Sequence, residues 1–284
     1  MERSSTKVAL AQRVAERLGE VPDVVAVALG GSLARGRALP NSDIDLGIYY
    51  RPARPPSIAA LRQLAAELDD SGLGDAVTDF GGWGPWVNGG AWLTIKGHRL
   101  DWIYRDLDLV ERVFDACERG EVARHIQAGH PHGFHTHNYL GEVHYGRSLV
   151  DPAGVLAHLK GRVDVYPERL AQALIESYSW RAYTALDAGE KSLARVESVY
   201  VAGCFFECGY CLVQVLFALN RRFFVNEKGA LGETRTFDQV PPGFADTVHE
   251  VLSHPGESMQ VLQQNWKRMW DLAYAVGELV GHEH

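Results

Sequence analysis

A chain of 284 residues, 46% hydrophobic and 23% charged, has the composition of an ordinary globular protein and the length of about two domains. Its formal net charge of −8 lacks the strongly basic footprint of proteins whose main partner is long duplex DNA or RNA. The N-terminal residues do not have the pattern of a secretion signal, and we expect no apolar run long enough to cross a membrane. The expected location is therefore the cytoplasm.

Residues 24–50 predict two short strands separated by a glycine-rich turn. The apolar run from Val24 to Leu29 has the length of a buried strand, and Gly30-Gly31-Ser32 lets the backbone turn and approach another group closely. One helical turn over 33–37 would point free N–H groups and the Ser32 hydroxyl forward. Such an arrangement suits a phosphate group.

Asp43 and Asp45 lie in the second predicted strand, 43–49, and share one face because strand side chains alternate. Two neighbouring carboxylates repel each other, and burying them without partners would cost on the order of several kcal/mol each. A divalent cation removes that cost, and Mg²⁺ typically lies between carboxylates and substrate phosphates. The alternative is a hairpin with a solvated acidic face, which the upstream Gly-Gly-Ser turn disfavours.

Gly-Gly-Ser, a short spacer and the segment 42–46, Ser-Asp-Ile-Asp-Leu, resemble the signature of the polymerase-β-type nucleotidyltransferase superfamily. The resemblance covers about residues 24–105. It implies an α+β fold with a small mixed β-sheet and flanking helices, and a third carboxylate on a later strand. By the same resemblance, a nucleotide would be bound by Gly31, Ser32 and Arg35, and two Mg²⁺ ions by Asp43, Asp45 and that third carboxylate.

The segment between 57 and 106 contains the candidates for the third carboxylate. A helix from Ser57, a glycine-rich stretch over 75–90 and two strands, 92–95 and 100–104, are predicted in that order. Asp101 shares a strand face with two neighbours at i−2 and i+2, so it is the natural third carboxylate if its strand lies beside the Asp43 strand. The rivals are Asp79 and Asp106, and we expect Asp106 to cap the helix that runs on to Gly120.

Two groups of potential metal ligands lie outside this motif. Zinc could use some of the six histidines between 125 and 144, although a polar or substrate-lining loop is the favoured interpretation. The spacing of Cys204, Cys208 and Cys211 is that of the iron–sulfur loop of radical SAM enzymes. These cysteines, however, fall on one stripe of an apolar helical pattern, so we expect them, with Cys117, to be reduced, and the three on the stripe to pack as small hydrophobic side chains.

The second half of the chain predicts helices only, so we place a catalytic domain at 1–150 and a helical bundle at 151–284. The predicted helices span 168–188, 192–222, 244–252 and 259–280, with Gly189 as a break. Many small-molecule nucleotidyltransferases resemble this plan, with a helical domain facing the catalytic cleft. By that analogy Lys228 would reach the triphosphate; the alternative is a solvated helix end.

The resemblance implies Mg²⁺-dependent transfer of a nucleoside monophosphate, expected to be AMP from ATP, to a hydroxyl of a small-molecule acceptor, with release of pyrophosphate. Asp101 or Glu197 would take the hydroxyl proton. The alternatives are AMP transfer to a protein, as in toxin–antitoxin systems, and a nucleotide-binding protein without turnover. The acidic charge disfavours a tRNA-tailing enzyme, and a P-loop motif is absent from the sequence. The expected partners are an NTP and a small molecule, with neither long nucleic acid nor a membrane.

Overall fold

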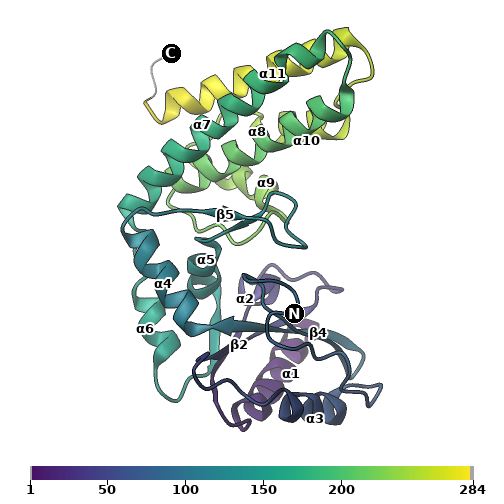
Figure 1. Cartoon of the computed structure of the whole chain (residues 1–284), viewed down its shortest axis with the longest axis vertical. Coiled ribbons are helices and arrows are strands. Elements are labelled where there is room, and N and C mark those ends of the chain that lie inside the picture. The colour runs from purple at the N-terminus through teal and green to yellow at the C-terminus, as the bar shows by residue number, and fades with distance from the viewer. Residues whose placement is uncertain (1, 282–284) are drawn as a thin grey trace. The chain divides into compact units, whose positions relative to one another are not determined.

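The computed structural model describes residues 2–281 and divides into two compact units whose segments alternate along the chain (Figure 1). The first unit comprises the chain up to 115 together with 125–129 and 136–165. The second comprises 116–124, 130–135 and the chain from 166 onward. From the sequence we predict a boundary between two domains near residue 150. That boundary stays a prediction.

A five-stranded sheet forms the centre of the first unit. Its strands are β1 (Val24–Leu29), β2 (Ile44–Tyr50), β3 (Gly90–Ile95), β4 (His98–Asp106) and β7 (Arg147–Val150), in the order β3-β4-β2-β1-β7. Strands β2 and β4 are parallel, whereas the other neighbouring pairs are antiparallel. The predicted small mixed sheet is therefore confirmed, and with it the α+β class.

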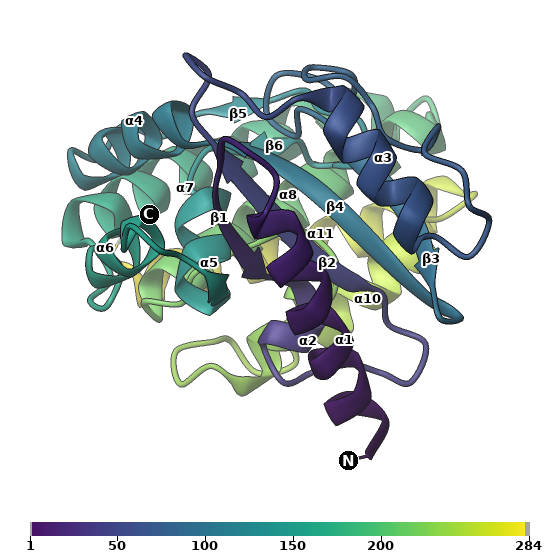
Figure 2. The ribbon, with the colours of Figure 1, turned by 90° about the horizontal axis from the view of Figure 1, so that it is seen from below.

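Helices α1 (Glu2–Gly19) and α3 (Ile58–Leu68) lie across one face of this sheet (Figure 2). Each helix carries an apolar stripe, and the stripes bury Leu10, Val14 and Leu61 against the strands. The inward side chains of β2 and β4 complete the same core, while Asp45 and Asp101, which alternate with them, are only partly buried. This alternation places the carboxylates on the sheet face opposite α1 and α3.

Helix α5 (Asn138–Tyr145) contributes Glu142 to the far end of that second face. The guanidinium of Arg105 on β4 is buried and donates to both carboxylate oxygens of Glu142, each at 2.7 Å. Arg105 lies four residues beyond Asp101, about 13 Å along the strand. The ion pair and the carboxylates thus occupy opposite ends of one sheet face. The remaining helices of this region are α2 (Gly31–Ala34), α4 (Leu107–Glu118) and α6 (Val155–Gly161).

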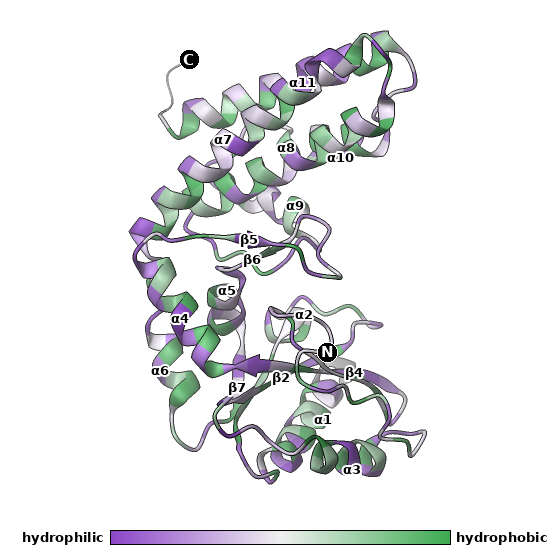
Figure 3. Ribbon diagram, in the orientation of Figure 1, coloured by the Kyte–Doolittle hydropathy of each residue, from purple (hydrophilic) through white to green (hydrophobic). Residues whose placement is uncertain are grey.

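The second unit is mainly helical, as predicted. Its long helices are α7 (Glu168–Leu193), α8 (Ser198–Leu219), α10 (Phe244–Ser253) and α11 (Met259–Leu279), with the short α9 (Ala230–Glu233) and a 3₁₀ turn at Thr234–Thr236. Figure 3 shows hydrophilic and hydrophobic colours mixed along α7 and α11, which is typical of helices with one solvated side. Short strands β5 (Arg124–His125) and β6 (Phe134–His135) pair with each other.

The predicted break at Gly189 is wrong. Helix α7 continues through Gly189 to Leu193, and the chain turns at 194–197 before α8 begins at Ser198. A Cβ on Gly189 would lie 2.6 Å from the Trp266 ring, so the glycine permits close helix packing rather than ending the helix. Sequence patterns cannot separate these two uses of glycine.

Helix α8 corrects the expectation about apolar runs. It spans 22 residues with a mean hydropathy of 1.7 over its most apolar window, so its length and composition would allow it to cross a membrane. Yet 72% of that window is buried inside the protein, as in the core helix of a soluble bundle. The four cysteines are free and buried, and three of them lie on this helix, in agreement with the packing role expected for them.

Candidate active site

The register of β2 and β4 brings the predicted carboxylates together. Asp45 is paired directly with Asp101 on the parallel neighbouring strand, so the two Cα atoms lie about 4.8 Å apart and their side chains share a face. Asp43 comes just before β2, and its Oδ1 lies 3.3 Å from Nε of Arg99 on β4. The condition set for Asp101, that its strand lies beside the Asp43 strand, is met.

The Gly-Gly-Ser turn lies directly against this row. The Gly30 N–H donates to the Asp45 carbonyl at 2.8 Å. Gly31 has a φ of 58°, and a Cβ there would lie 1.7 Å from Oδ2 of Asp45. Only glycine fits this position, because both the backbone conformation and the nearby carboxylate exclude a side chain. Ser32 is half-buried in the same turn, and the Arg35 guanidinium lies 4.4 Å above the Tyr145 ring.

Lys7 is a residue of this region that sequence analysis missed. It is only 6% exposed, and its Nζ donates to the carbonyls of Pro40 at 2.8 Å and Ser42 at 2.6 Å. The ammonium thereby fixes the loop that leads into Asp43. A signal was present, because Lys7 precedes Leu10 and Val14 by three and seven residues and so falls on the buried face of α1.

The rival carboxylates have other roles. Asp79 is 76% exposed and pairs with Arg62 at 3.0 Å, whereas the Oδ1 of Asp106 accepts from the Leu109 N–H at 3.1 Å and caps α4, as expected. Glu197 is exposed at the start of α8, and Lys228 is exposed in the turn after α8. Both belong to the second unit. The roles assigned to Glu197 and Lys228, like those of the three aspartates, stay predictions.

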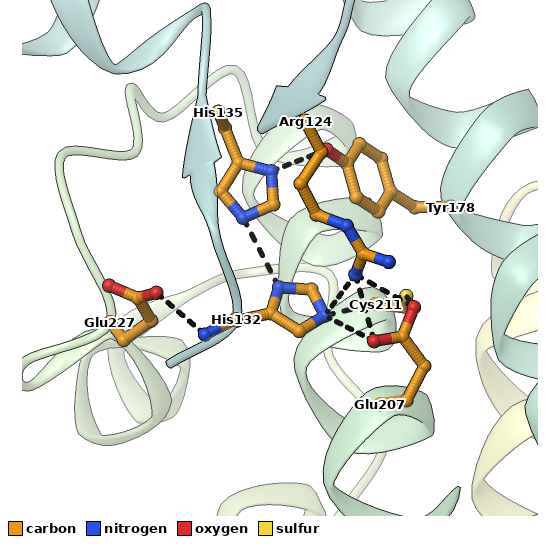
Figure 4. A network of polar contacts seen from close by, with 7 residues as sticks. All are labelled: Arg124, His132, His135, Tyr178, Glu207, Cys211 and Glu227. Carbon is orange, nitrogen blue, oxygen red and sulfur yellow. Dashed lines mark hydrogen bonds and ion pairs between the residues drawn. The ribbon is translucent and has the colours of Figure 1, made fainter. Parts of the chain in front are cut away.

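A second polar cluster lies in the second unit (Figure 4). Nη1 of Arg124 lies 2.7 and 2.8 Å from the two Glu207 oxygens and 3.1 Å from Nε2 of His132. Nε2 of His132 also lies 3.4 Å from a Glu207 oxygen, and its Nδ1 lies 3.2 Å from Nε2 of His135. His135 in turn bonds the Tyr178 hydroxyl through Nδ1.

Within residues 2–281, the group of three potential metal ligands that the structure brings within 4.8 Å of one another is His132, Glu207 and Cys211. Burial would raise the pKa of Glu207, but His132 and Arg124 outweigh it and lower that pKa to about 2. Burial raises the pKa of Cys211 well above its usual value, so its thiol stays protonated at neutral pH. The Arg124 guanidinium already contacts Glu207 and His132 of this group and neutralises the carboxylate.

The six histidines do not form one site. His125 stacks on Trp86 with ring centroids 4.2 Å apart, and His144 bonds the Val163 carbonyl through Nδ1 at 2.9 Å. His130 pairs with Glu227 at 3.3 Å, and His137 lies buried at the start of α5. Of the six, His132 alone joins a group of three potential ligands among the described residues.

Comparison with known families agrees with the carboxylate geometry. Residues 9–79 match the family model of the nucleotidyltransferase domain. The chain carries a nucleotidyltransferase domain of the polymerase-β-type superfamily. The match includes the Gly-Gly-Ser turn, Asp43 and Asp45 but ends before Asp101, whose place beside them therefore rests on the register of β4.

The rest of the chain has less informative relatives. Residues 135–228 match a family described as a domain of unknown function, DUF4037. A nucleotidyltransferase-like protein from Exiguobacterium sibiricum 255-15 aligns with 96% of this chain and 78% of its own at 11% identity and a TM-score of 0.46. No curated protein matches the chain. The nucleotidyltransferase domain is thus the part of the protein that the comparisons assign.

Proposed function

We propose that this nucleotidyltransferase uses Mg²⁺ to transfer a nucleoside monophosphate, AMP from ATP, to a hydroxyl of a small-molecule acceptor. The observation that carries the proposal is the pairing of Asp45 with Asp101 beside a turn whose Gly31 packs against the Asp45 carboxylate. Transfer forms a bond from the acceptor oxygen to the α-phosphorus, breaks the bond to the β-phosphate oxygen and releases pyrophosphate. The cytoplasm, the expected location, supplies ATP.

The residues present fit magnesium. Carboxylate oxygens are the hard ligands that Mg²⁺ prefers, and three of them share one sheet face. Arg99 is the cation paired with Asp43, and its side chain is 74% exposed, so displacing it costs at most about 1 kcal/mol. When bound, the metal would neutralise phosphate charge and lower the pKa of the acceptor hydroxyl.

The side chains and backbone of the chain supply orientation and proton transfer. The backbone N–H groups of Gly31 and Ser32 and the Ser32 hydroxyl can donate to phosphate oxygens, with Arg35 nearby as a cation. Asp101 lies on the side of the row away from that turn and is our candidate to accept the hydroxyl proton. The phosphate contact of Lys228 and the alternative base Glu197 are proposals from family analogy, to be tested by substitution.

Calorimetry tests the nucleotide site directly. ATP, GTP, CTP and UTP are titrated with and without Mg²⁺ into the wild type, Asp43→Asn and the control Asp79→Asn, which alters an exposed carboxylate on a loop. We expect binding of ATP that requires Mg²⁺ and Asp43 and is unchanged in the control. Binding that is equal in all three proteins, or absent from the wild type, would overturn the proposal.

A further inference from the structure

A stacked pair of tryptophans lies beside the carboxylate row. The ring centroids of Trp83 and Trp92 are 4.6 Å apart, and their planes differ by 17°. Trp92, on β3, is 65% exposed even though Trp83 covers part of its surface. Leaving a large apolar ring in water costs free energy, so an exposed and ordered indole calls for an explanation beyond packing.

Strand register places this pair next to the proposed chemistry. Trp92 is paired directly with Asp101 across β3 and β4, and Asp101 with Asp45 across β4 and β2. Directly paired residues share a face, with Cβ atoms about 5 Å apart. A single row therefore runs Trp92, Asp101, Asp45, and the Gly30-Gly31 turn follows at its other end.

The loop that carries Trp83 is held in place by a buried side chain. Gln127 is 5% exposed; its Nε2 donates to the Trp83 carbonyl at 2.7 Å, and its Oε1 accepts from the backbone N–H of Val87 at 3.3 Å. Gly84 has a φ of 129°, and a Cβ there would lie 2.7 Å from Oε1 of Gln127. The position of Trp83 is thus set before any ligand arrives, which lowers the entropy cost of binding.

We propose that Trp83 and Trp92 form a stacking subsite for a flat ring of the acceptor, with a hydroxyl of that ring at Asp101. This inference rests on the proposed function. In phosphoryl transfer the attacking and leaving oxygens lie roughly in line. With pyrophosphate leaving toward Gly31 and Ser32, the acceptor enters from the opposite end of the row, where Trp92 lies.

The neighbouring side chains define the chemistry of the ring. An indole face accepts either an aromatic ring or the apolar C–H face of a sugar ring. Thr94 and Arg99 are paired with each other in the adjacent row of the same face, and both are exposed. They offer a hydroxyl and a guanidinium to polar groups at the edge of the ring. The acceptor is therefore a ring with one flat apolar face and a hydroxyl at its rim.

Ligand-observed saturation-transfer NMR tests the subsite. The probes are methyl β-D-glucopyranoside, 4-methylphenol and, as a polyol without a ring, glycerol. The proteins are the wild type, Trp92→Ala, Trp92→Phe and Trp180→Ala, in which a tryptophan of similar exposure, 66%, is removed from α7. We expect ring-probe signals about fivefold weaker in Trp92→Ala, partly kept in Trp92→Phe and unchanged in Trp180→Ala. Equal signals in the wild type and Trp92→Ala would overturn the subsite.

Titration of ATP with Mg²⁺ separates the acceptor from the nucleobase. We expect the Kd of Trp92→Ala to stay within about twofold of the wild type. An ATP affinity lost as fully as in Asp43→Asn would assign the stacking surface to the nucleobase and overturn the acceptor subsite. If the wild type binds no triphosphate while the ring probes still depend on Trp92, the ring site stands and the proposed nucleotidyl transfer fails. The preferred ring probe names the class of acceptor to screen.

Discussion

Each of the two units contains a group of potential metal ligands that includes carboxylates, but the two groups differ in how their negative charge is neutralised. In the first unit, three aspartates share a sheet face beside a glycine turn. In the second unit, Glu207 lies with His132 and Cys211 within 4.8 Å. Among the described residues, proximity of three ligand atoms picks out the second group and not the aspartates, so proximity alone does not identify the site that the nucleotidyltransferase domain uses.

The difference lies in the cation that each group already has. Arg124 is 23% exposed and binds both oxygens of Glu207 through Nη1, at 2.7 and 2.8 Å. Arg99 is 74% exposed and approaches Asp43 at 3.3 Å. A half-buried guanidinium with short hydrogen bonds is a fixed part of the fold, whereas an exposed one can leave when a ligand arrives. The first group is thus suited to binding and the second to holding the helices.

The largest effect is expected from Asp45→Asn, which removes a proposed metal ligand with little change in shape. Metal sites contribute several kcal/mol to transition states, so we expect nucleotidyl transfer to fall roughly ten-thousandfold. The measurement is pyrophosphate release with ATP and an acceptor, beside thermal melting to show that the fold is kept. Asp79→Asn is the control, and a variant Asp45→Asn with more than a tenth of wild-type turnover would contradict the assignment.

Arg105 and Arg99 both lie on β4, and they allow a buried guanidinium to be compared with an exposed one. Arg105→Met leaves the Glu142 carboxylate without its bidentate partner, and we expect a loss of about 3 kcal/mol in the free energy of unfolding. Arg99→Met should cost less than about 0.5 kcal/mol. Urea denaturation measures both. Similar losses in the free energy of unfolding for the two variants would contradict the distinction between a fixed arginine and a displaceable one.

Zinc tests whether Arg124, which contacts Glu207 and His132, keeps a metal from binding this group. In Arg124→Ala the cation is gone, and we expect Zn²⁺ to bind His132, Glu207 and Cys211. At a hundredfold excess over the dissociation constant, binding would stabilise the variant by about 2.7 kcal/mol. Thermal melting with and without Zn²⁺ reports this.

The cysteines supply the control for the zinc experiment. Arg124→Ala combined with Cys211→Ala should lose the zinc effect, whereas the combination with Cys117→Ser should keep it, because Cys117 is buried outside the group. A wild type stabilised by zinc as strongly as the variant would show that Arg124 does not exclude the metal.

The sequence allowed prediction of features that depend on local patterns. The β1 strand, the Gly-Gly-Ser turn and the alternation around Asp43 and Asp45 involve neighbouring residues, and the structure agrees with them. Asp101 was nominated by its strand face, but its position beside Asp45 depended on a parallel register that no local pattern encodes. Lys7 was missed for a different reason, since a lysine on an apolar stripe is usually assumed to reach water.

Features that join distant segments could not be predicted. Arg124 and Glu207 are separated by 83 positions, and His132 and Cys211 by 79, so only the tertiary packing of the β5–β6 segment against α8 brings them together. The stacking of Trp83 on Trp92 depends on Gln127, which comes 44 positions after Trp83. The histidine-rich segment drew attention by composition. His132 and His135 contact each other, whereas His125 and His144 make separate contacts elsewhere.

The smallest expected effect is a pH dependence that distinguishes Glu207 from an exposed acid. The folded pKa of Glu207 is about 2, below the model-peptide value of about 4.5 for an unfolded glutamate. A lowered folded pKa adds stability above the unfolded pKa, and that stability is lost as the pH falls from about 4.5 toward 2. We expect Glu207→Gln to cost about 1–2 kcal/mol at pH 7, after allowance for partial exposure of the carboxylate, and almost nothing near pH 2. Urea denaturation between pH 2 and 7 measures the difference in the free energy of unfolding between the variant and the wild type.

Glu168→Gln is the control, because it breaks an exposed pair with Arg221. Its free energy of unfolding should differ from that of the wild type by less than about 0.5 kcal/mol at every pH. A Glu207→Gln difference that did not shrink in acid would mean that packing of the side chain, rather than its charge beside Arg124 and His132, stabilises this part of the second unit.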